Sequence, residues 1–306
     1  MRYLEIDGLR LSRIGLGTWQ FGSREWGYGE SYATDVAPAL LRRAIELGIT
    51  MIDTAEMYGF GRSERIIGDT LADLAPADRD RLTIATKFMP IAPVEAIVRR
   101  EAEGSARRLR DDLLDLYYVH WPNPFVSPHR VGQAVRPLLE SGTVRRVGVS
   151  NHSIAQWKEA ERGLRRPAIA NQVRFSLMAP GPATELVPFA ADNGRVIVAY
   201  SPLGQGLLAG KDPALMTGIR GMQRAGRGRD TDAITTLRTA VSEIATANDA
   251  MPAQVSLAWL LSHPNTIAIP GASTVEQLEH NTAAADLVLS ADELARLTEA
   301  SHPFRG

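Results

Sequence analysis

The sequence contains no cysteine among its 306 residues. This absence excludes a disulfide-stapled scaffold, a thiolate metal site and a cysteine nucleophile together. The composition is otherwise ordinary for a globular chain, with 44% apolar and 23% charged residues. Collagenous and disordered architectures are therefore excluded as well.

Long apolar runs are also missing. No window approaches the roughly 20 apolar residues that a membrane span requires, and residues 1–13 carry frequent charges instead of the apolar core of a signal peptide. Acidic and basic residues nearly cancel, 35 against 34, so composition indicates no nucleic-acid or anionic membrane surface. We expect a cytoplasmic protein that binds neither nucleic acid nor membrane.

Lysine is scarce. Only Lys87, Lys158 and Lys211 occur among the 34 basic residues, and the others are arginine. Because arginine supplies the generic positive charge of this chain, a lysine in an apolar strand indicates a need for a compact ammonium that a planar guanidinium cannot replace.

Short β-branched runs alternate with longer amphipathic ones, which is typical of repeated βα units. A hairpin comes first, with residues 4–6 and 9–11 flanking the turn-forming Asp7-Gly8, and is expected to cover one end of the fold. No linker interrupts the pattern, which predicts an α/β fold: a single (β/α)8 TIM barrel domain over residues 1–306, with an N-terminal β-hairpin and extra C-terminal helices. The eight expected barrel strands cover residues 14–16, 51–53, 82–86, 116–120, 146–150, 168–172, 196–200 and 266–269.

Helices are expected between these strands, each ending at a glycine or a charged turn. The Gly- and Arg-rich residues 220–230 are expected to form a loop, and the conformation of residues 204–231 is not predicted. The expected helices cover residues 35–47, 62–73, 94–108, 129–140, 153–162, 184–192, 233–248, 253–262, 275–285 and 291–301.

Ionisable residues lie at the carboxyl ends of three of the expected strands, where barrel active sites lie. Asp53 ends the second strand and Tyr58 comes after it, Lys87 directly follows the third strand, and His120 ends the fourth. Taken singly, Asp53 could be a turn residue, Tyr58 a packing aromatic and His120 a core histidine. Together they predict a general acid that needs neither a metal nor a protein nucleophile.

The predicted chemistry depends on a buried lysine. Lys87 needs an anion, which Asp53 on the neighbouring strand can supply. The retained positive charge is expected to lower the pKa of Tyr58 from about 10 toward neutrality, so that the phenol acts as an acid. His120 would orient the acceptor, which we expect to be a carbonyl oxygen.

These residues stand in longer motifs that run in register from the hairpin to the last helices. In that order the motifs resemble those of the aldo-keto reductase superfamily, in particular the branch of bacterial general reductases and potassium-channel β subunits. The motifs are Asp53-Thr54-Ala55-Glu56-Met57-Tyr58-Gly59, Gly61-Arg62-Ser63-Glu64, Ala85-Thr86-Lys87, Val119-His120-Trp121 and Gly148-Val149-Ser150-Asn151.

The resemblance implies a catalytic tetrad and a cofactor. Tyr58 would donate the proton, Lys87 and Asp53 would tune it, and His120 would position the substrate carbonyl. The implied activity is the reversible, NADPH-dependent reduction of an aldehyde or ketone to the alcohol, with the cofactor extended across the top of the barrel.

The resemblance also implies where the cofactor lies. Ser150, Asn151 and Gln172 carry groups able to hold a carboxamide, so no Rossmann glycine motif is needed. Tyr200 would stack on the nicotinamide ring, and Lys211 would approach the phosphates. The implied cofactor contacts are Gly17, Thr18, Trp19, Asp53, Ser150, Asn151, Gln172, Tyr200, Ser201, Pro202, Leu203, Gly204, Gly206, Leu208, Lys211, Gly271, Ser273, Gln277, His280 and Asn281.

Aromatic side chains in the loops after the strands could line the substrate mouth. The expected substrate contacts are Trp19, Tyr58, Phe88, His120 and Trp121, and Trp26 and Tyr28 could also contribute.

The chain departs from the family pattern at the adenosine end. Many members have glutamate where His280 stands, and some have lysine or arginine at Gly271 and Gln277 to hold the 2′-phosphate. The resemblance nevertheless implies NADPH rather than NADH.

Two other functions remain open at the sequence level. The same tetrad would serve a cofactor-sensing regulatory module with slow chemistry. Alternatively, Lys87 could form a Schiff base as in an aldolase, although an ammonium paired with Asp53 is a poor nucleophile. The sequence predicts neither the individual carbonyl substrate nor the oligomeric state.

Overall fold

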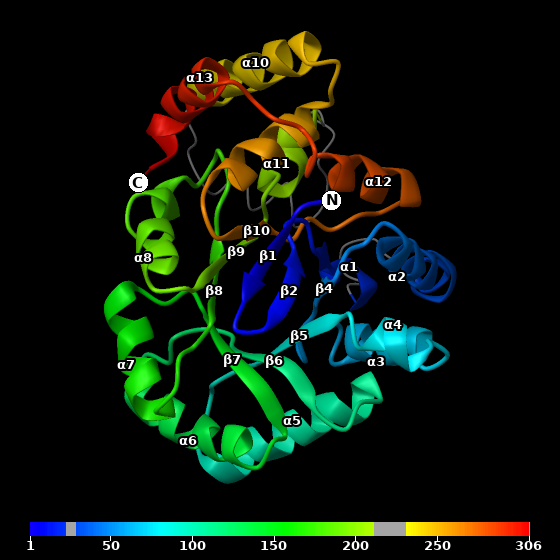
Figure 1. The fold of residues 1–306 in the computed structure, drawn as a ribbon, viewed down its shortest axis with the longest axis vertical. Coiled ribbons are helices and arrows are strands. Elements are labelled where there is room, and N and C mark those ends of the chain that lie inside the picture. The colour runs from blue at the N-terminus through cyan, green and yellow to red at the C-terminus, as the bar shows by residue number, and fades with distance from the viewer. Residues whose placement is uncertain (23–28, 211–230, 306) are drawn as a thin grey trace.

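The computed structural model describes residues 1–22, 29–210 and 231–305. Eight parallel strands form a barrel ringed by helices, and an antiparallel hairpin precedes them (Figure 1). Ile14 pairs in parallel with Ala268, and the Gly15 amide donates to the Ala268 carbonyl at 2.8 Å, so the last strand meets the first. The expected (β/α)8 barrel is confirmed. The strands are β1 (Tyr3–Ile6), β2 (Leu9–Ser12), β3 (Leu16–Gly17), β4 (Met51–Asp53), β5 (Thr83–Phe88), β6 (Leu114–Val119), β7 (Val144–Ser150), β8 (Ala170–Arg174), β9 (Val196–Tyr200) and β10 (Thr266–Ala268).

The helices follow the expected order, and side-chain caps fix several of their first turns. Ser153 and Gln156 form a reciprocal capping box at the start of one helix, and Ser290 and Glu293 form another. The α-helices are α1 (Trp19–Gly22), α2 (Ala37–Glu46), α3 (Arg62–Leu71), α4 (Pro76–Arg79), α5 (Glu95–Leu109), α6 (Pro128–Glu140), α7 (Ile154–Leu164), α8 (Leu186–Asp192), α10 (Thr231–Ala247), α11 (Pro252–Ser262), α12 (Val275–Ala283) and α13 (Ala291–Ser301).

Strand alternation separates two apolar layers. On β6, Tyr118 belongs to the cluster inside the barrel, whereas Tyr117 belongs to the cluster between the sheet and the helices. On β5, Lys87 and Phe88 likewise point to opposite faces, because successive side chains alternate. This alternation determines which strand residues can reach the site.

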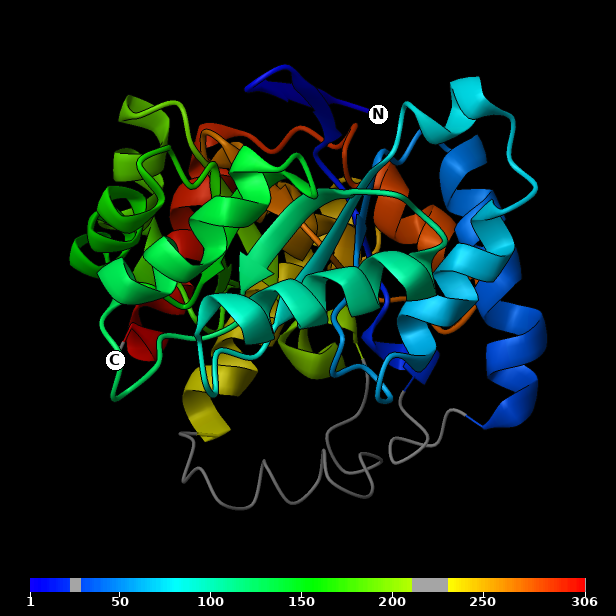
Figure 2. The same cartoon turned by 90° about the horizontal axis from the view of Figure 1, so that it is seen from below.

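The hairpin closes the amino-terminal end of the barrel. Ile6 and Leu11 pack into the interior cluster. Thr50, which directly precedes β4, donates to the Arg10 carbonyl and accepts from the Ser12 amide, each at 2.8 Å. The hairpin therefore lies at the end opposite the carboxyl ends of the strands, as Figures 1 and 2 show. At the carboxyl terminus, α13 packs against α10 beside the barrel (Figure 1).

Helix bounds shift by one or two residues from the expected ones, and one helix ends for a different reason. The predicted helix over residues 153–162 was expected to end at Gly163, but α7 continues to Leu164 and is terminated by Arg165, whose φ is 56°. The glycine instead allows α7 to approach α6, since a Cβ at Gly163 would lie 2.0 Å from the His129 carbonyl oxygen.

Some elements were not predicted. These are the single turns α1 and α4, the π-helical turn Tyr32–Val36 and the 3₁₀ turns at Gly181–Ala183, Gly204–Ala209 and His302–Phe304. Trp26, Tyr28, Lys211 and the expected loop over residues 220–230 lie outside the described residues.

Candidate active site

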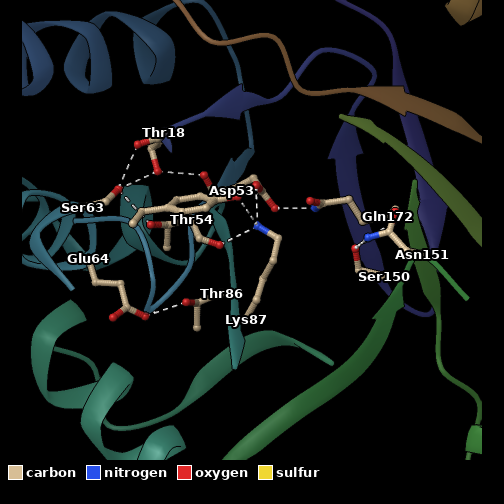
Figure 3. A network of polar contacts seen from close by, with 11 residues as sticks. Thr18, Asp53, Thr54, Ser63, Glu64, Thr86, Lys87, Ser150, Asn151 and Gln172 are labelled. Atoms are coloured by element: carbon tan, nitrogen blue, oxygen red, sulfur yellow. Dashed lines mark hydrogen bonds and ion pairs between the residues drawn. The ribbon is translucent and has the colours of Figure 1, made fainter. Parts of the chain in front are cut away.

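An ion pair buried in the barrel forms the centre of the site. Asp53 ends β4, and Lys87 lies on the adjacent β5. Lys87 Nζ lies 2.7 Å from Asp53 Oδ1, and the two side chains are 0% and 2% exposed. The ammonium also donates to the Thr54 carbonyl at 2.7 Å (Figure 3). These converging acceptors suit a compact ammonium and explain lysine at this position.

Tyr58 provides a third hydrogen-bond acceptor for the ammonium. Lys87 Nζ donates to the Tyr58 hydroxyl at 3.3 Å. The tyrosine lies in the loop over residues 54–61, which joins β4 to α3. Its ring centroid lies 6.2 Å from that of His120, with the planes at 75°. The structure thus brings Asp53, Tyr58, Lys87 and His120 together at the carboxyl ends of β4, β5 and β6.

The pKa of Tyr58 moves against our expectation. Burial raises the pKa of the phenol, the Lys87 ammonium lowers it, the Asp53 carboxylate raises it again, and the net shift is upward. The expected fall below the ordinary value is therefore wrong for this structure. Lys87 limits the rise, because a positive charge favours the phenolate.

The ammonium itself is retained. Burial lowers the pKa of Lys87, but Asp53 and Tyr58 together raise it by more than burial lowers it, so the net shift is upward. Burial raises the pKa of Asp53, and the ammonium and the Gln172 amide oppose that rise. Gln172 Nε2, on β8 across the barrel, donates to Asp53 Oδ2 at 2.6 Å. Each carboxylate oxygen of Asp53 therefore has a donor.

His120 is neutral at physiological pH. Burial, and then the charge of Lys87, lower its pKa to about 3. A neutral imidazole carries one N–H donor and one acceptor nitrogen, and His120 Nδ1 is buried without a hydrogen-bond partner. The Trp121 ring stacks beside it at 6.3 Å between centroids. His120 can therefore donate a hydrogen bond without adding charge.

Polar groups at the ends of β7, β8 and β9 form a connected chain. The Tyr200 hydroxyl donates to Asn151 Oδ1 at 3.0 Å, and Asn151 Nδ2 donates to Ser150 Oγ at 2.9 Å. The Ser150 hydroxyl donates to the Gln172 carbonyl at 2.8 Å. Hydroxyl and amide groups on adjacent strand ends match the donors and acceptors of a carboxamide.

The segment after β9 has an irregular backbone. Ser201, Gly204, Gln205 and Gly206 all have positive φ, from 50° to 97°. Pro202 and Leu208 are buried, and Leu203 is half-buried. Lys211, expected to contact the phosphates, lies outside the described residues.

The start of α12 is capped by its own side chains. Thr274 Oγ1 accepts from the backbone N–H of Gln277 at 3.2 Å. The side chain of Gln277 in turn accepts, through Oε1, from the backbone N–H of Ser273 at 2.9 Å. The Gln20 side chain lies against Gly271, where a Cβ would come within 2.1 Å of it. Gln277 is therefore engaged with the helix start in this structure.

Two residues expected to contact ligands lie elsewhere. Phe88 is 1% exposed and stacks on Tyr117 at 5.1 Å, between the sheet and the helices. Its expected place at the substrate mouth is wrong, because it follows Lys87 and so points to the other face of β5. The Thr18 hydroxyl is buried and donates to the Asp53 carbonyl at 2.8 Å, which places this side chain behind the ion pair. Trp19 is half-buried and Trp121 is 45% exposed.

A second network behind the tetrad was not predicted. The buried Ser63 hydroxyl lies 2.8 Å from Thr18 Oγ1 and accepts from the Thr54 hydroxyl at 2.9 Å. The buried Glu64 accepts from the Thr86 hydroxyl at 2.6 Å (Figure 3). It also accepts from Arg108 Nε at 2.6 Å. Thr54, Ser63, Glu64 and Thr86 stand inside the quoted motifs, and the polarity of these motif positions was the signal available for finding them.

The described part of the chain contains no helix with the length and hydropathy needed to cross a bilayer. Within the same residues, no group of three or more histidine, aspartate or glutamate side chains could hold a metal ion.

Comparisons with known proteins agree on one family. The model for the family described as "Aldo/keto reductase family" matches residues 13–302. An uncharacterized oxidoreductase of Mycobacterium tuberculosis is 48% identical, over 100% of this chain and 94% of the relative. Methylglyoxal reductase YeaE of Escherichia coli is 35% identical, over 98% of this chain and 94% of the relative.

Solved structures agree as well. An aldo/keto reductase from Klebsiella pneumoniae in complex with NADP and acetate is 31% identical, with a TM-score of 0.76 over 97% of this chain and 94% of that chain. The thermostable aldo-keto reductase Tm1743, in complex with the inhibitor epalrestat, is 31% identical, with a TM-score of 0.79 over 98% of this chain and 100% of that chain.

Proposed function

The chain belongs to the aldo/keto reductase family, and from that premise we propose that it reduces an aldehyde or ketone to the alcohol with NADPH, Tyr58 being the proton donor. Membership makes it an NAD(P)H-dependent oxidoreductase. The carbonyl reaction, the preference for NADPH and the role of each residue are our proposal.

The observation that carries the proposal is the buried ammonium within reach of the phenol. Lys87 Nζ, 3.3 Å from the Tyr58 hydroxyl, stabilises the phenolate that remains when the tyrosine gives up its proton. Asp53 keeps the lysine charged. His120, as a neutral donor, holds the carbonyl oxygen near the phenol, and this geometry favours proton transfer to that oxygen.

The residues of β7 to β9 support a nicotinamide cofactor, which would supply the hydride. We assign Ser150, Asn151 and Gln172 to its carboxamide and Tyr200 to the face of its ring. Gly204, Gly206 and Lys211 would contact the phosphates, and the start of α12 the adenosine end. NADP bound to the Klebsiella pneumoniae neighbour supports NADPH as the cofactor.

The test replaces the phenol alone. Tyr58→Phe keeps the ring and removes the hydroxyl, so we expect turnover to be lost on every carbonyl, beginning with methylglyoxal, the substrate in the name of one relative. The dissociation constant of NADPH, measured by fluorescence quenching, should change little. A variant that still turns over, or that loses cofactor binding with turnover, contradicts the assigned role.

A further inference from the structure

The loop over residues 54–61, which carries Tyr58, is attached to the end of β5 by Glu56. The Glu56 amide donates to the Lys87 carbonyl at 3.2 Å. Its side-chain Oε1 accepts from the Met89 amide at 2.7 Å. One glutamate thus binds the loop of the phenol to the backbone of the ammonium-bearing residue and to the residue two positions beyond.

The surroundings of this carboxylate are unfavourable to it. Glu56 Oε2 is buried without a hydrogen-bond partner. Burial raises the pKa of Glu56 to about 7, and the nearby carboxylates of Glu101 and Glu64 add to this rise. The hydrogen bond from the Met89 amide opposes it. Arg108 opposes that rise, but its Nε donates to Glu64. Unfavourable polar burial of this kind is expected where it supports a site rather than stability.

We propose that Glu56 is a positioning residue, whose bond to the Met89 amide sets the distance between the Tyr58 hydroxyl and the Lys87 ammonium. The other side of the loop has its own anchors: the Ser63 amide donates to the Tyr58 carbonyl at 3.2 Å, and Thr54 bonds to Ser63. Glu56 supplies the anchor on the lysine side. The kinetic part of this inference rests on the proposed function.

The experiment compares three replacements of Glu56. Alanine removes the acceptor, aspartate keeps the charge but is too short to reach the Met89 amide, and glutamine keeps both length and acceptor. We expect kcat to fall about tenfold to a hundredfold in Glu56→Ala and Glu56→Asp, as misplaced catalytic groups do, and to return largely in Glu56→Gln. The dissociation constant of NADPH should stay unchanged in all three. Glu103→Ala, an exposed glutamate on α5, is the matched control.

A second readout does not depend on turnover. Ionisation of Tyr58 can be followed by phenolate absorbance, as the difference between each variant and the same variant carrying Tyr58→Phe. Because Lys87 lowers the pKa of Tyr58, a loosened loop should shift this titration to higher pH in Glu56→Ala and Glu56→Asp but not in Glu56→Gln.

The outcomes separate the two proposals. If the native chain reduces no carbonyl, the proposed function fails and the phenolate titration alone decides the role of Glu56. An unmoved titration overturns that role, as does equal loss of kcat in Glu56→Gln and Glu56→Ala. If Glu56→Ala does not fold, Glu56→Asp serves in its place, and native-like kcat and titration in that variant also overturn it.

Discussion

Lys87 shows how much one side chain carries at the residue scale. Its ammonium forms an ion pair with Asp53 and donates a hydrogen bond to the Thr54 carbonyl. It also limits the rise in the pKa of Tyr58 that burial causes. A buried charge that loses its partner is costly, whereas removal of both partners costs far less. Replacement of this lysine should therefore change both the free energy of unfolding and the turnover of the protein.

Lys87→Met keeps most of the side-chain length but leaves the Asp53 carboxylate buried without its countercharge. We expect turnover to be lost and the free energy of unfolding to fall by about 3 to 5 kcal/mol. Urea titration of Lys87→Met, Asp53→Asn and the double variant would measure the coupling. Lys158→Met, at an exposed lysine, is the control. Additive effects of the two substitutions would contradict the pairing.

Glu56 gives a prediction for pH. Its pKa in the folded protein is about 7, above the ordinary value of 4.5, so the folded state holds an extra proton between these values and loses stability as pH rises through that range. Glu56→Gln should therefore raise the melting temperature at pH 8 and have little effect at pH 5. Glu103→Gln, at an exposed position on α5, should show no such pH-dependent gain.

At the scale of elements, the contact between α6 and α7 depends on glycine. A Cβ at Gly163 would meet the His129 carbonyl oxygen at 2.0 Å, and one at Gly132 would meet the Ala160 carbonyl oxygen at 2.4 Å. Both obstacles are backbone atoms, which cannot rotate away. The two helices would have to separate to admit a methyl group on either side.

Gly163→Ala tests that contact against helix propensity. Alanine in a helix is intrinsically better than glycine by about 1 kcal/mol, but we expect the clash to dominate and to destabilise the protein by about 1 to 3 kcal/mol. Gly181→Ala is the matched control, since no atom lies closer than 4.0 Å to its added Cβ. Thermal unfolding of both variants decides which effect is larger.

Periodicity predicted the elements because alternating and helical patterns both report burial. It placed all eight barrel strands and every long helix. It could not assign Gly163, since a glycine that ends a helix and one that lets two helices touch look alike in a sequence. The single turns α1 and α4 are too short to show a period.

For the site, sequence reasoning grouped Asp53, Tyr58, Lys87 and His120, because strand ends in a barrel converge on one face. It could not find the bond from Gln172 to Asp53, which crosses the barrel between strands that are not neighbours. The direction of the Tyr58 pKa was also missed, because its sign depends on how deeply the phenol is buried.

At the scale of the whole molecule, the hairpin and the tetrad lie at opposite ends of the barrel. The hairpin packs Leu11, 0% exposed, into the amino-terminal end, and the tetrad lies at the carboxyl end. A substitution in the hairpin should therefore lower the stability of the protein without changing its chemistry.

Leu11→Ala should lower the free energy of unfolding by about 2 to 5 kcal/mol, as deletion of a buried leucine does. Leu9→Ala, at a partly buried position of the same hairpin, should cost less. At temperatures where both variants are folded, kcat and the dissociation constant of NADPH should match those of the native chain. A lower kcat in folded Leu11→Ala would falsify the separation of the two ends.

Asp53 draws one donor from each half of the chain, Lys87 from the third barrel strand and Gln172 from the sixth. A fragment ending before β8 would leave one oxygen of this carboxylate bare. The acid centre therefore acquires its full set of donors only when the ring of strands is assembled. Two half-barrels expressed separately would have to associate before the proposed acid centre could form.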